Sequence, residues 1–173
     1  MKEAIKKLRE LTGFGISDCK KALEENDQDV EKALGYLRKK GAKILEEKSQ
    51  RQTKEGIIEA YIHFSQNLGA MVEINCESDF VARNPDFKKF AKEMAMQVAA
   101  CEPQYISQGE VPPELIEGLS SSEKEEFFRK KCLLSQPYLK DSTLTVQDYL
   151  NSLGAKFKEN IVIKRFVRFS LGG

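Results

Sequence analysis

The sequence predicts an α+β protein, in which a small helical bundle precedes a core made of a three-stranded antiparallel sheet with packed helices. Apolar residues recur at helical spacing through the first forty residues, and they alternate with polar residues in later stretches. A segment rich in Lys, Arg, Glu and Gln separates the two patterns. We therefore expect a helical domain over residues 1–40, a charged linker over 41–55 and an α+β core over 56–173.

The first forty residues predict three short helices. Gly13-Phe14-Gly15 interrupts the first pattern and is expected to form an exposed loop for binding. In the third helix Val30, Leu34 and Leu37 share one face, and Gly41 is expected to end it. The segment that follows fits a solvated linker or an exposed helix. It has a basic excess but no interleaved aromatic residues, which argues against a nucleic-acid patch.

Three later stretches predict the strands of the sheet. Residues 56–64 and 69–77 alternate in polarity, and the short connection between them indicates an antiparallel hairpin. The third stretch, residues 161–171, is rich in β-branched and aromatic side chains. Its apolar residues are expected on both faces, with Phe166 on one face and the following residues on the other: Ile161, Ile163, Val167 and Phe169.

Helix starts are marked by capping residues. Asn84-Pro85 predicts the start of a long helix, whose apolar residues from 87 to 98 recur at 3.6-residue spacing. Ser120 followed by Glu123 has the pattern of a capping box and predicts a second helix. A further short helix is expected over residues 145–154. These helices are expected to pack on one side of the sheet.

The junction between the second strand and the long helix is the best candidate for a contact site. Ser78, Asp79, Phe80 and Val81 form a short connection that regular elements hold at both ends. Such a connection presents a side chain with little loss of entropy on binding. Phe80 is the candidate tip. The alternative is that Phe80 and Val81 both turn inward as ordinary core residues.

Composition excludes several classes of function. The 28 basic and 27 acidic residues give a net charge of +1, which provides no field to attract nucleic acid. No run approaches the roughly 18 apolar residues that a membrane-spanning helix requires. We expect a soluble, cytoplasmic protein that binds neither nucleic acid nor membranes.

Catalytic chemistry finds little support. No G-x-x-x-x-G-K-[ST] or G-x-G-x-x-G phosphate loop occurs, and we expect no cofactor, no metal and no catalytic residue. The four cysteines are far apart without a C-x-x-C pair, which favours packed, reduced thiols over disulfides or a zinc site: Cys19, Cys76, Cys101 and Cys132. A thiol hydrolase built on Cys76 and the single histidine, His63, is the enzymatic alternative, although nothing supplies a third orienting group.

Three blocks of sequence carry a family resemblance. The first block comprises L-R-E-L-T-G-F-G-I-S-D-C-K-K-A-L and D-V-E-K-A-L-G-Y-L-R-K-K-G. The second is E-I-N-C-E-S-D-F-V-A-R-N-P-D-F, and the third comprises C-L-L-S-Q-P-Y-L-K-D and R-F-V-R-F-S-L-G. In order and to the end of the chain these blocks resemble bacterial elongation factor Ts, and the first is similar to that family's ubiquitin-associated-like N-terminal domain.

The resemblance implies a guanine nucleotide exchange factor for elongation factor Tu that acts by protein contact and not as an enzyme. It implies that Asp79 and Phe80 push in beside the nucleotide and disturb the Mg²⁺ and phosphate contacts. Ser78, which replaces the family's usual threonine, and Val81 are implied to flank them. The alternative is a protein-binding module whose ubiquitin-associated-like bundle does not act on a GTPase.

Two further contacts are implied by the resemblance. Arg9, Ile16 and Ser17 match positions that grip the GTPase's G domain, with Ile16 and Ser17 standing where two methionines are common. The C-L-L-S-Q-P-Y-L-K-D block and the tail are implied to reach the partner's later domains. Longer members of the family carry two core subdomains, whereas this chain has one small sheet with open edges. A symmetric homodimer built through the core sheet and the C-terminal strand is therefore expected.

Overall fold

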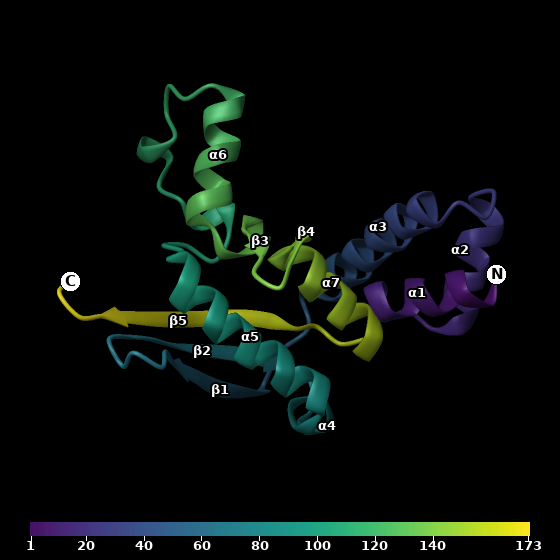
Figure 1. The fold of residues 1–173 in the computed structure, drawn as a ribbon, viewed down its shortest axis with the longest axis horizontal. Coiled ribbons are helices and arrows are strands. Elements are labelled where there is room, and N and C mark those ends of the chain that lie inside the picture. Colours follow the sequence, from purple (N-terminus) through teal and green to yellow (C-terminus); the bar gives the residue numbers. More distant parts are fainter. The chain divides into compact units, whose positions relative to one another are not determined.

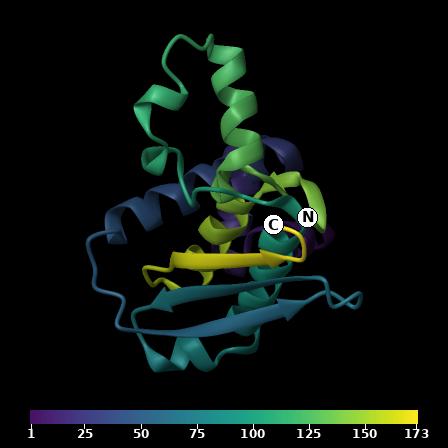
Figure 2. The same cartoon turned by 90° about the vertical axis from the view of Figure 1, so that its left-hand side faces the viewer.

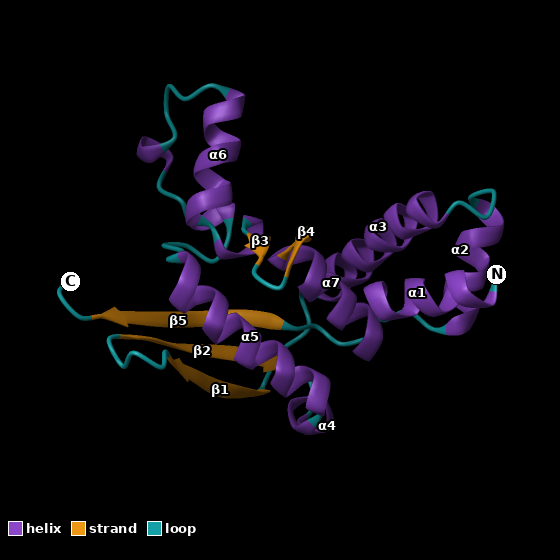
Figure 3. Cartoon of the chain, in the orientation of Figure 1, coloured by secondary structure: helices purple, strands orange, loops and turns teal.

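The computed structural model describes all 173 residues and confirms the α+β class, with helices first and a three-stranded antiparallel sheet after them (Figures 1 and 3). The chain forms two compact units. Unit 1 comprises residues 1–53 and 148–161, and unit 2 comprises residues 54–147 and 162–173. Residues 148–161 are expected from the sequence to belong to the core, whereas the structure groups them with the N-terminal helices. None of the helices combines the length and apolar composition needed to cross a membrane.

Unit 1 consists of four helices: α1 (Lys2–Thr12), α2 (Ile16–Glu25), α3 (Val30–Lys48) and most of α7 (Val146–Phe157). The Asp29 side chain caps α3, because its Oδ1 accepts the backbone N–H groups of residues 31 and 32 at 2.9 and 3.1 Å. The prediction that α3 ends at Gly41 is wrong, since the helix continues to Lys48. A β-carbon at Gly41 would lie 3.4 Å from the Asn151 carbonyl oxygen, so this glycine permits a close approach of α7.

A small hydrophobic core holds unit 1 together. Leu8, Leu23 and Leu37, one from each N-terminal helix, are fully buried, and Ala155 of α7 belongs to the same cluster. Phe14 also lies in this core and is only 6% exposed. The prediction of an exposed Gly-Phe-Gly binding loop is therefore wrong, because burial of the aromatic ring outweighs the flexibility of the flanking glycines.

Unit 2 is built on a sheet with the strand order β1 (Glu55–Ile62), β2 (Leu68–Cys76) and β5 (Val162–Ser170), and every pair is antiparallel. The predicted hairpin is confirmed by the pairing of Ile62 with Gly69. Helix α5 (Pro85–Cys101) covers one face of the sheet (Figure 2). Its fully buried side chains, together with those of β2, form the core of unit 2: Phe87, Phe90, Met94 and Val98 with Val72 and Ile74.

A bulge in β5 changes which side chains face α5. Ile74 pairs with Ile163, but the preceding residue of β2 pairs with Arg165, which leaves Lys164 as an extra residue. The expectation that Ile163 and Val167 share a face is therefore wrong. Ile163 is buried beside Ile74, whereas Val167 is exposed on the other side of the sheet.

The sheet face away from α5, here called the open face, is largely apolar. Cross-strand pairing brings five exposed side chains to it: Ile58, Ile62, Met71, Val167 and Phe169. The ion pair between Glu73 Oε2 and Arg165 Nε, at 2.6 Å, lies on the same face. Exposed apolar patches of this kind mark interaction sites in soluble proteins.

Both predicted helix starts in unit 2 are confirmed by capping geometry. Asn84 Oδ1 accepts the Asp86 N–H at 2.9 Å, and Pro85 is the first residue of α5. Ser120 and Glu123 form the predicted capping box of α6 (Ser121–Lys131), in which each side chain accepts the other's backbone N–H.

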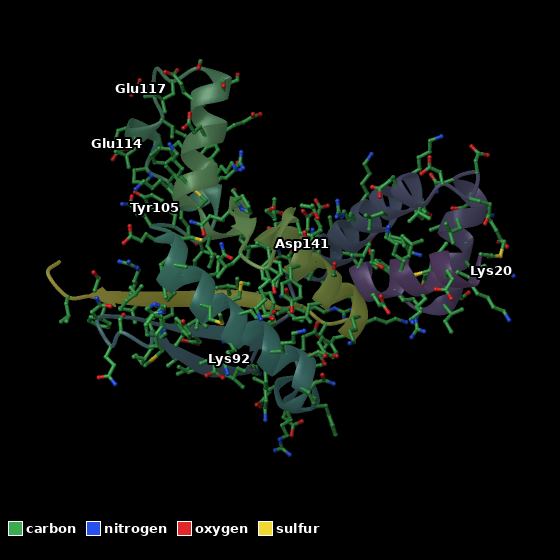
Figure 4. The ribbon with its side chains drawn as sticks, in the orientation of Figure 1. Lys20, Lys92, Tyr105, Glu114, Glu117 and Asp141 are labelled. Carbon is green, nitrogen blue, oxygen red and sulfur yellow. The ribbon has the colours of Figure 1, made fainter.

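Two further features of unit 2 were not predicted. β3 (Pro137–Tyr138) and β4 (Asp141–Thr145) form a two-stranded antiparallel ribbon. Residues 102–136 form an arm that contains α6 and three short 3₁₀ helices, η1 (Gln108–Glu110), η2 (Pro113–Leu115) and η3 (Leu133–Ser135). Tyr105 lies near the base of the arm, and Glu114 and Glu117 lie farther out (Figure 4).

Candidate partner-binding site

The residues between β2 and α5 form a short helix, α4 (Asp79–Arg83), where the sequence predicted only a connection. Ser78 caps it, because its Oγ accepts the Val81 N–H at 3.5 Å and its carbonyl accepts the Ala82 N–H at 3.2 Å. The helix ends where the Asn84 N–H donates to the Val81 carbonyl at 3.0 Å. Since Asn84 also caps α5, the junction is fixed at both ends.

Helix α4 places its two large apolar side chains on opposite sides. Val81 is buried and Ala82 beside it is buried as well, whereas Phe80 is 83% exposed. Full burial of a phenylalanine side chain stabilises a fold by about 1.5–3 kcal/mol, a gain that Phe80 forgoes in the isolated chain. The inward alternative is therefore wrong for Phe80 and right for Val81.

Two contacts brace the base of α4. Asp79 Oδ2 lies 3.2 Å from Arg83 Nη2, one helical turn away. The Cys76 thiol, at the end of β2, donates to the Ser78 carbonyl at 3.2 Å. The structure thus brings together the four residues predicted at this site and presents one of them, Phe80, to the solvent.

The second predicted group of residues lies in unit 1. Arg9 is in the last turn of α1, and Ile16 and Ser17 open α2. All three are exposed, and Ile16 is 58% exposed although it is aliphatic. Lys20, one turn further along α2, points away from the bundle (Figure 4). The three residues therefore flank one short loop on the surface of unit 1.

The cysteine and histidine alternative is wrong. Cys76 pairs with Glu55 at one end of the hairpin, whereas His63 follows Ile62 at the other end, about 26 Å away at the rise of an extended strand. His63 Nδ1 instead lies 2.9 Å from the Tyr61 hydroxyl. Burial raises the pKa of the other three thiols above the ordinary value, which lowers their nucleophilicity at neutral pH.

No group of three or more His, Cys, Asp or Glu side chains is placed to hold a metal ion.

Sequence reasoning missed two supporting side chains. Arg83 has the i,i+4 spacing to Asp79 that signals a helical ion pair, but this signal was hidden because no helix was predicted here. Lys40 Nζ lies 2.7 Å from Asp18 Oδ1, next to Ser17, and 5.7 Å from the centre of the Phe14 ring. The hydrogen bond to Asp18 raises the pKa of Lys40. No local pattern predicts this pair, because the two residues are 22 positions apart.

Comparison with known proteins shows the family of the chain. The family model for elongation factor Ts matches residues 3–130. The elongation factor Ts of Thermotoga neapolitana is 46% identical over 189 aligned residues, which cover 98% of this chain and 96% of the relative. The Thermotoga maritima protein is 47% identical over 98% and 95% of the two chains, and the Carboxydothermus hydrogenoformans protein is 44% identical over 98% and 88%. The chain therefore belongs to the elongation factor Ts family of translation elongation factors.

Proposed function

We propose that this chain is a guanine nucleotide exchange factor for elongation factor Tu. It binds the GDP form of that GTPase, disturbs the Mg²⁺ and phosphate site, and promotes GDP release by contact alone. The observation that carries the proposal is Phe80, an aromatic ring that is 83% exposed on a helix fixed at both ends. Membership of the elongation factor Ts family supports the choice of elongation factor Tu as the partner.

The physical basis of exchange is thermodynamic linkage. A protein that binds the nucleotide-free GTPase more tightly than the GDP form lowers the affinity for GDP by the same factor. Insertion of Phe80 buries about 150–250 Å² of aromatic surface in a pocket that opens only when the nucleotide site is displaced. The free energy that Phe80 forgoes in the isolated chain is thus gained in the complex.

Each residue of the junction has a distinct role in this proposal. Asp79 and Phe80 are the residues that enter the partner, with the Asp79 carboxylate competing with the phosphates for the positive charge at the nucleotide site. Ser78 and Val81 do not enter. Ser78 caps α4 and Val81 anchors it in the core, so that Phe80 is presented without a search through conformations.

Unit 1 supplies the grip on the G domain. Ile16 provides apolar area, Ser17 a hydroxyl group, and Arg9 a positive charge at the rim. Because these residues belong to a different unit from Phe80, the proposal separates affinity from release. Loss of the grip weakens binding, and loss of Phe80 slows exchange in the complex that still forms.

The open face is covered by a second copy of the chain in this proposal. Five apolar side chains are exposed there, and a hollow of about 310 Å³ at one end is lined by Ile62, Gly69, Phe169 and Leu171. A two-fold pairing buries the same patch on both subunits, and it allows sheet-on-sheet packing of the kind found in β-sandwiches. The assembly then contains two GTPases and two exchange factors.

Release of a fluorescent GDP analogue from elongation factor Tu tests the function. The rate is measured with and without the protein in an excess of unlabelled GDP. We expect a rate that rises with protein concentration and then saturates. An unchanged rate at concentrations where a complex is detected by gel filtration would overturn the proposal.

A further inference from the structure

Helix α7 lies against the loop that precedes Ile16 and Ser17, although the two are far apart in sequence. Residues 13–17, here called the corner, comprise this loop and the first two residues of α2. Gly13 has a φ of +69°, and its N–H donates to the Arg9 carbonyl at 2.9 Å. A β-carbon at Gly13 would lie 3.1 Å from the Ser152 carbonyl oxygen and 3.2 Å from Lys156 Cβ. The backbone of the corner therefore rests directly on α7.

Contacts with α3 fix α7 in this position. A β-carbon at Gly154 would lie 2.5 Å from Leu45 Cδ2, so the Leu45 side chain of α3 packs against the α7 backbone in the space that the glycine leaves. Beyond α7, Asn160 Nδ2 donates to the carbonyls of Ser49 and Arg51 at 3.3 and 2.8 Å. The Lys48 ammonium donates to the Lys158 carbonyl in the same place. α7 is thus held along its length and at its end.

The corner is supported on its inner side and open on its outer side. Phe14 lies in the core next to Gly41, and the Cys19 thiol contacts the Phe14 carbonyl at 3.8 Å. Ile16, two residues further on, is exposed. A surface that is already ordered before association loses little conformational entropy in binding.

We infer that α7 positions the corner, and that the crossing of α7 with α3 thereby sets the affinity of unit 1 for its partner. This inference rests on the proposed function, in which Ile16 contacts an apolar patch of the GTPase. α7 itself touches no partner; Ser152 and Lys156 are positioning residues that act through Gly13. Displacement of α7 from α3 removes the support of the corner. The Ile16 side chain is then still exposed, but its backbone no longer has one fixed conformation.

The test uses full-length variants of three residues. Gly154→Leu places a side chain where Leu45 lies, and we expect it to displace α7; Leu45→Ala in the same chain restores the space. Gly35→Leu is the matched control, because a β-carbon at Gly35, on α3, meets nothing within 4 Å. We expect Gly154→Leu to raise the concentration that gives half-maximal GDP release by roughly five-fold, the effect of losing one interface contact. The maximal rate should not change, since Phe80 belongs to unit 2. Leu45→Ala should reverse the effect, and Gly35→Leu should have none.

A double-mutant cycle separates positioning from general damage to the fold. If α7 acts through the corner, Gly154→Leu adds little to the loss already caused by Ile16→Ala, because the contact it supports is gone. Additive losses, or a fall in the maximal rate alone, would overturn the inference. If far-UV circular dichroism shows that Gly154→Leu unfolds unit 1, Gly154→Ala replaces it in the same cycle. Failure of the wild-type chain to accelerate release refutes the proposed function itself, and the inference falls with it.

Discussion

Asp79 and Arg83 form an ion pair across one turn of α4, with 3.2 Å between Oδ2 and Nη2. The pair is exposed, so its contribution to helix stability is about 0.3–0.5 kcal/mol. Arg83→Gln should therefore slow maximal GDP release by about twofold, through a less ordered α4. The matched control is Lys130→Gln, which removes the i,i+4 pair with Glu126 in α6. Equal effects of the two substitutions would contradict a specific role for Arg83.

Phe80 should account for most of the acceleration. Truncation of a central aromatic anchor commonly costs at least about 2 kcal/mol, which corresponds to roughly thirty-fold in rate. Phe80→Ala should lower the maximal release rate by this factor while the melting temperature is unchanged, because the ring is exposed in the isolated chain. Phe64→Ala serves as the control, since Phe64 is 88% exposed at the opposite end of the hairpin. A Phe80→Ala variant that exchanges normally would remove Phe80 from the mechanism.

The homodimer should depend on the open face. Light scattering at micromolar concentration should give about twice the 19.7 kDa mass of one chain. Phe169→Asp places a charge in the apolar patch and should give the monomer mass, because burying an unpaired carboxylate is costly. Leu115→Asp, on the arm, controls for charge and should leave the mass unchanged. A wild-type mass of one chain, independent of concentration, would rule out the dimer.

Glu73 should make stability depend on pH in the acid range. The hydrogen bond from Arg165 lowers the pKa of the Glu73 carboxyl below its ordinary value of 4.5. Because the folded-state pKa is the lower one, the contribution is complete above pH 4.5 and is lost as the pH falls through the folded-state pKa. Urea unfolding between pH 7 and pH 3, in the Phe169→Asp background, should show a smaller acid loss for Glu73→Gln. Parallel curves for the two proteins would contradict this assignment.

Deletion of residues 1–40 should affect more than binding. Residues 56–173 are expected from the sequence to form a core separate from residues 1–40, but α7 packs on the helices that the deletion removes. We expect the sheet and α5 to persist, while α7 loses the core that covers Ala155. Hydrogen exchange should show protection in β2 and α5 but not in α7. Full protection of α7 in the truncated chain would show that it needs no support from unit 1.

The elements that the sequence predicted correctly are those with local signals. The capping side chains of Asn84 and Ser120 act within three residues, and the alternation of β1 and β2 fixes their faces before any tertiary contact is considered. The prediction at Gly41 is wrong for a tertiary reason. A glycine after an apolar run commonly ends a helix, but here it admits the backbone of α7. The bulge at Lys164 has no local signal, and it reverses the faces of the residues on either side.

The site was only partly predictable for the same reason. That Ser78 to Val81 lie between two rigid elements follows from the sequence, and Ser78 has the residue type of a cap. The direction of Phe80 does not follow, because an aromatic residue beside a buried valine is more often core than tip. Five residues of helix turn Phe80 and Val81 to different sides, and that helix is too short to give a periodic pattern.

The hydrogen bonds of Asn160 to Ser49 and Arg51 have a consequence for folding during synthesis. The Asn160 amide donates to carbonyls 109 and 111 positions earlier in the chain, so the end of α3 lacks this partner until residue 160 has left the ribosome. The edge strand β5 follows Asn160 directly, so the sheet also lacks its third strand until this stage. Contacts of such high sequence separation slow folding. Until β5 and α7 emerge, the growing chain exposes the β2 edge and the face of the N-terminal helices that α7 covers. We expect misfolding and aggregation of the nascent chain to begin at these two surfaces.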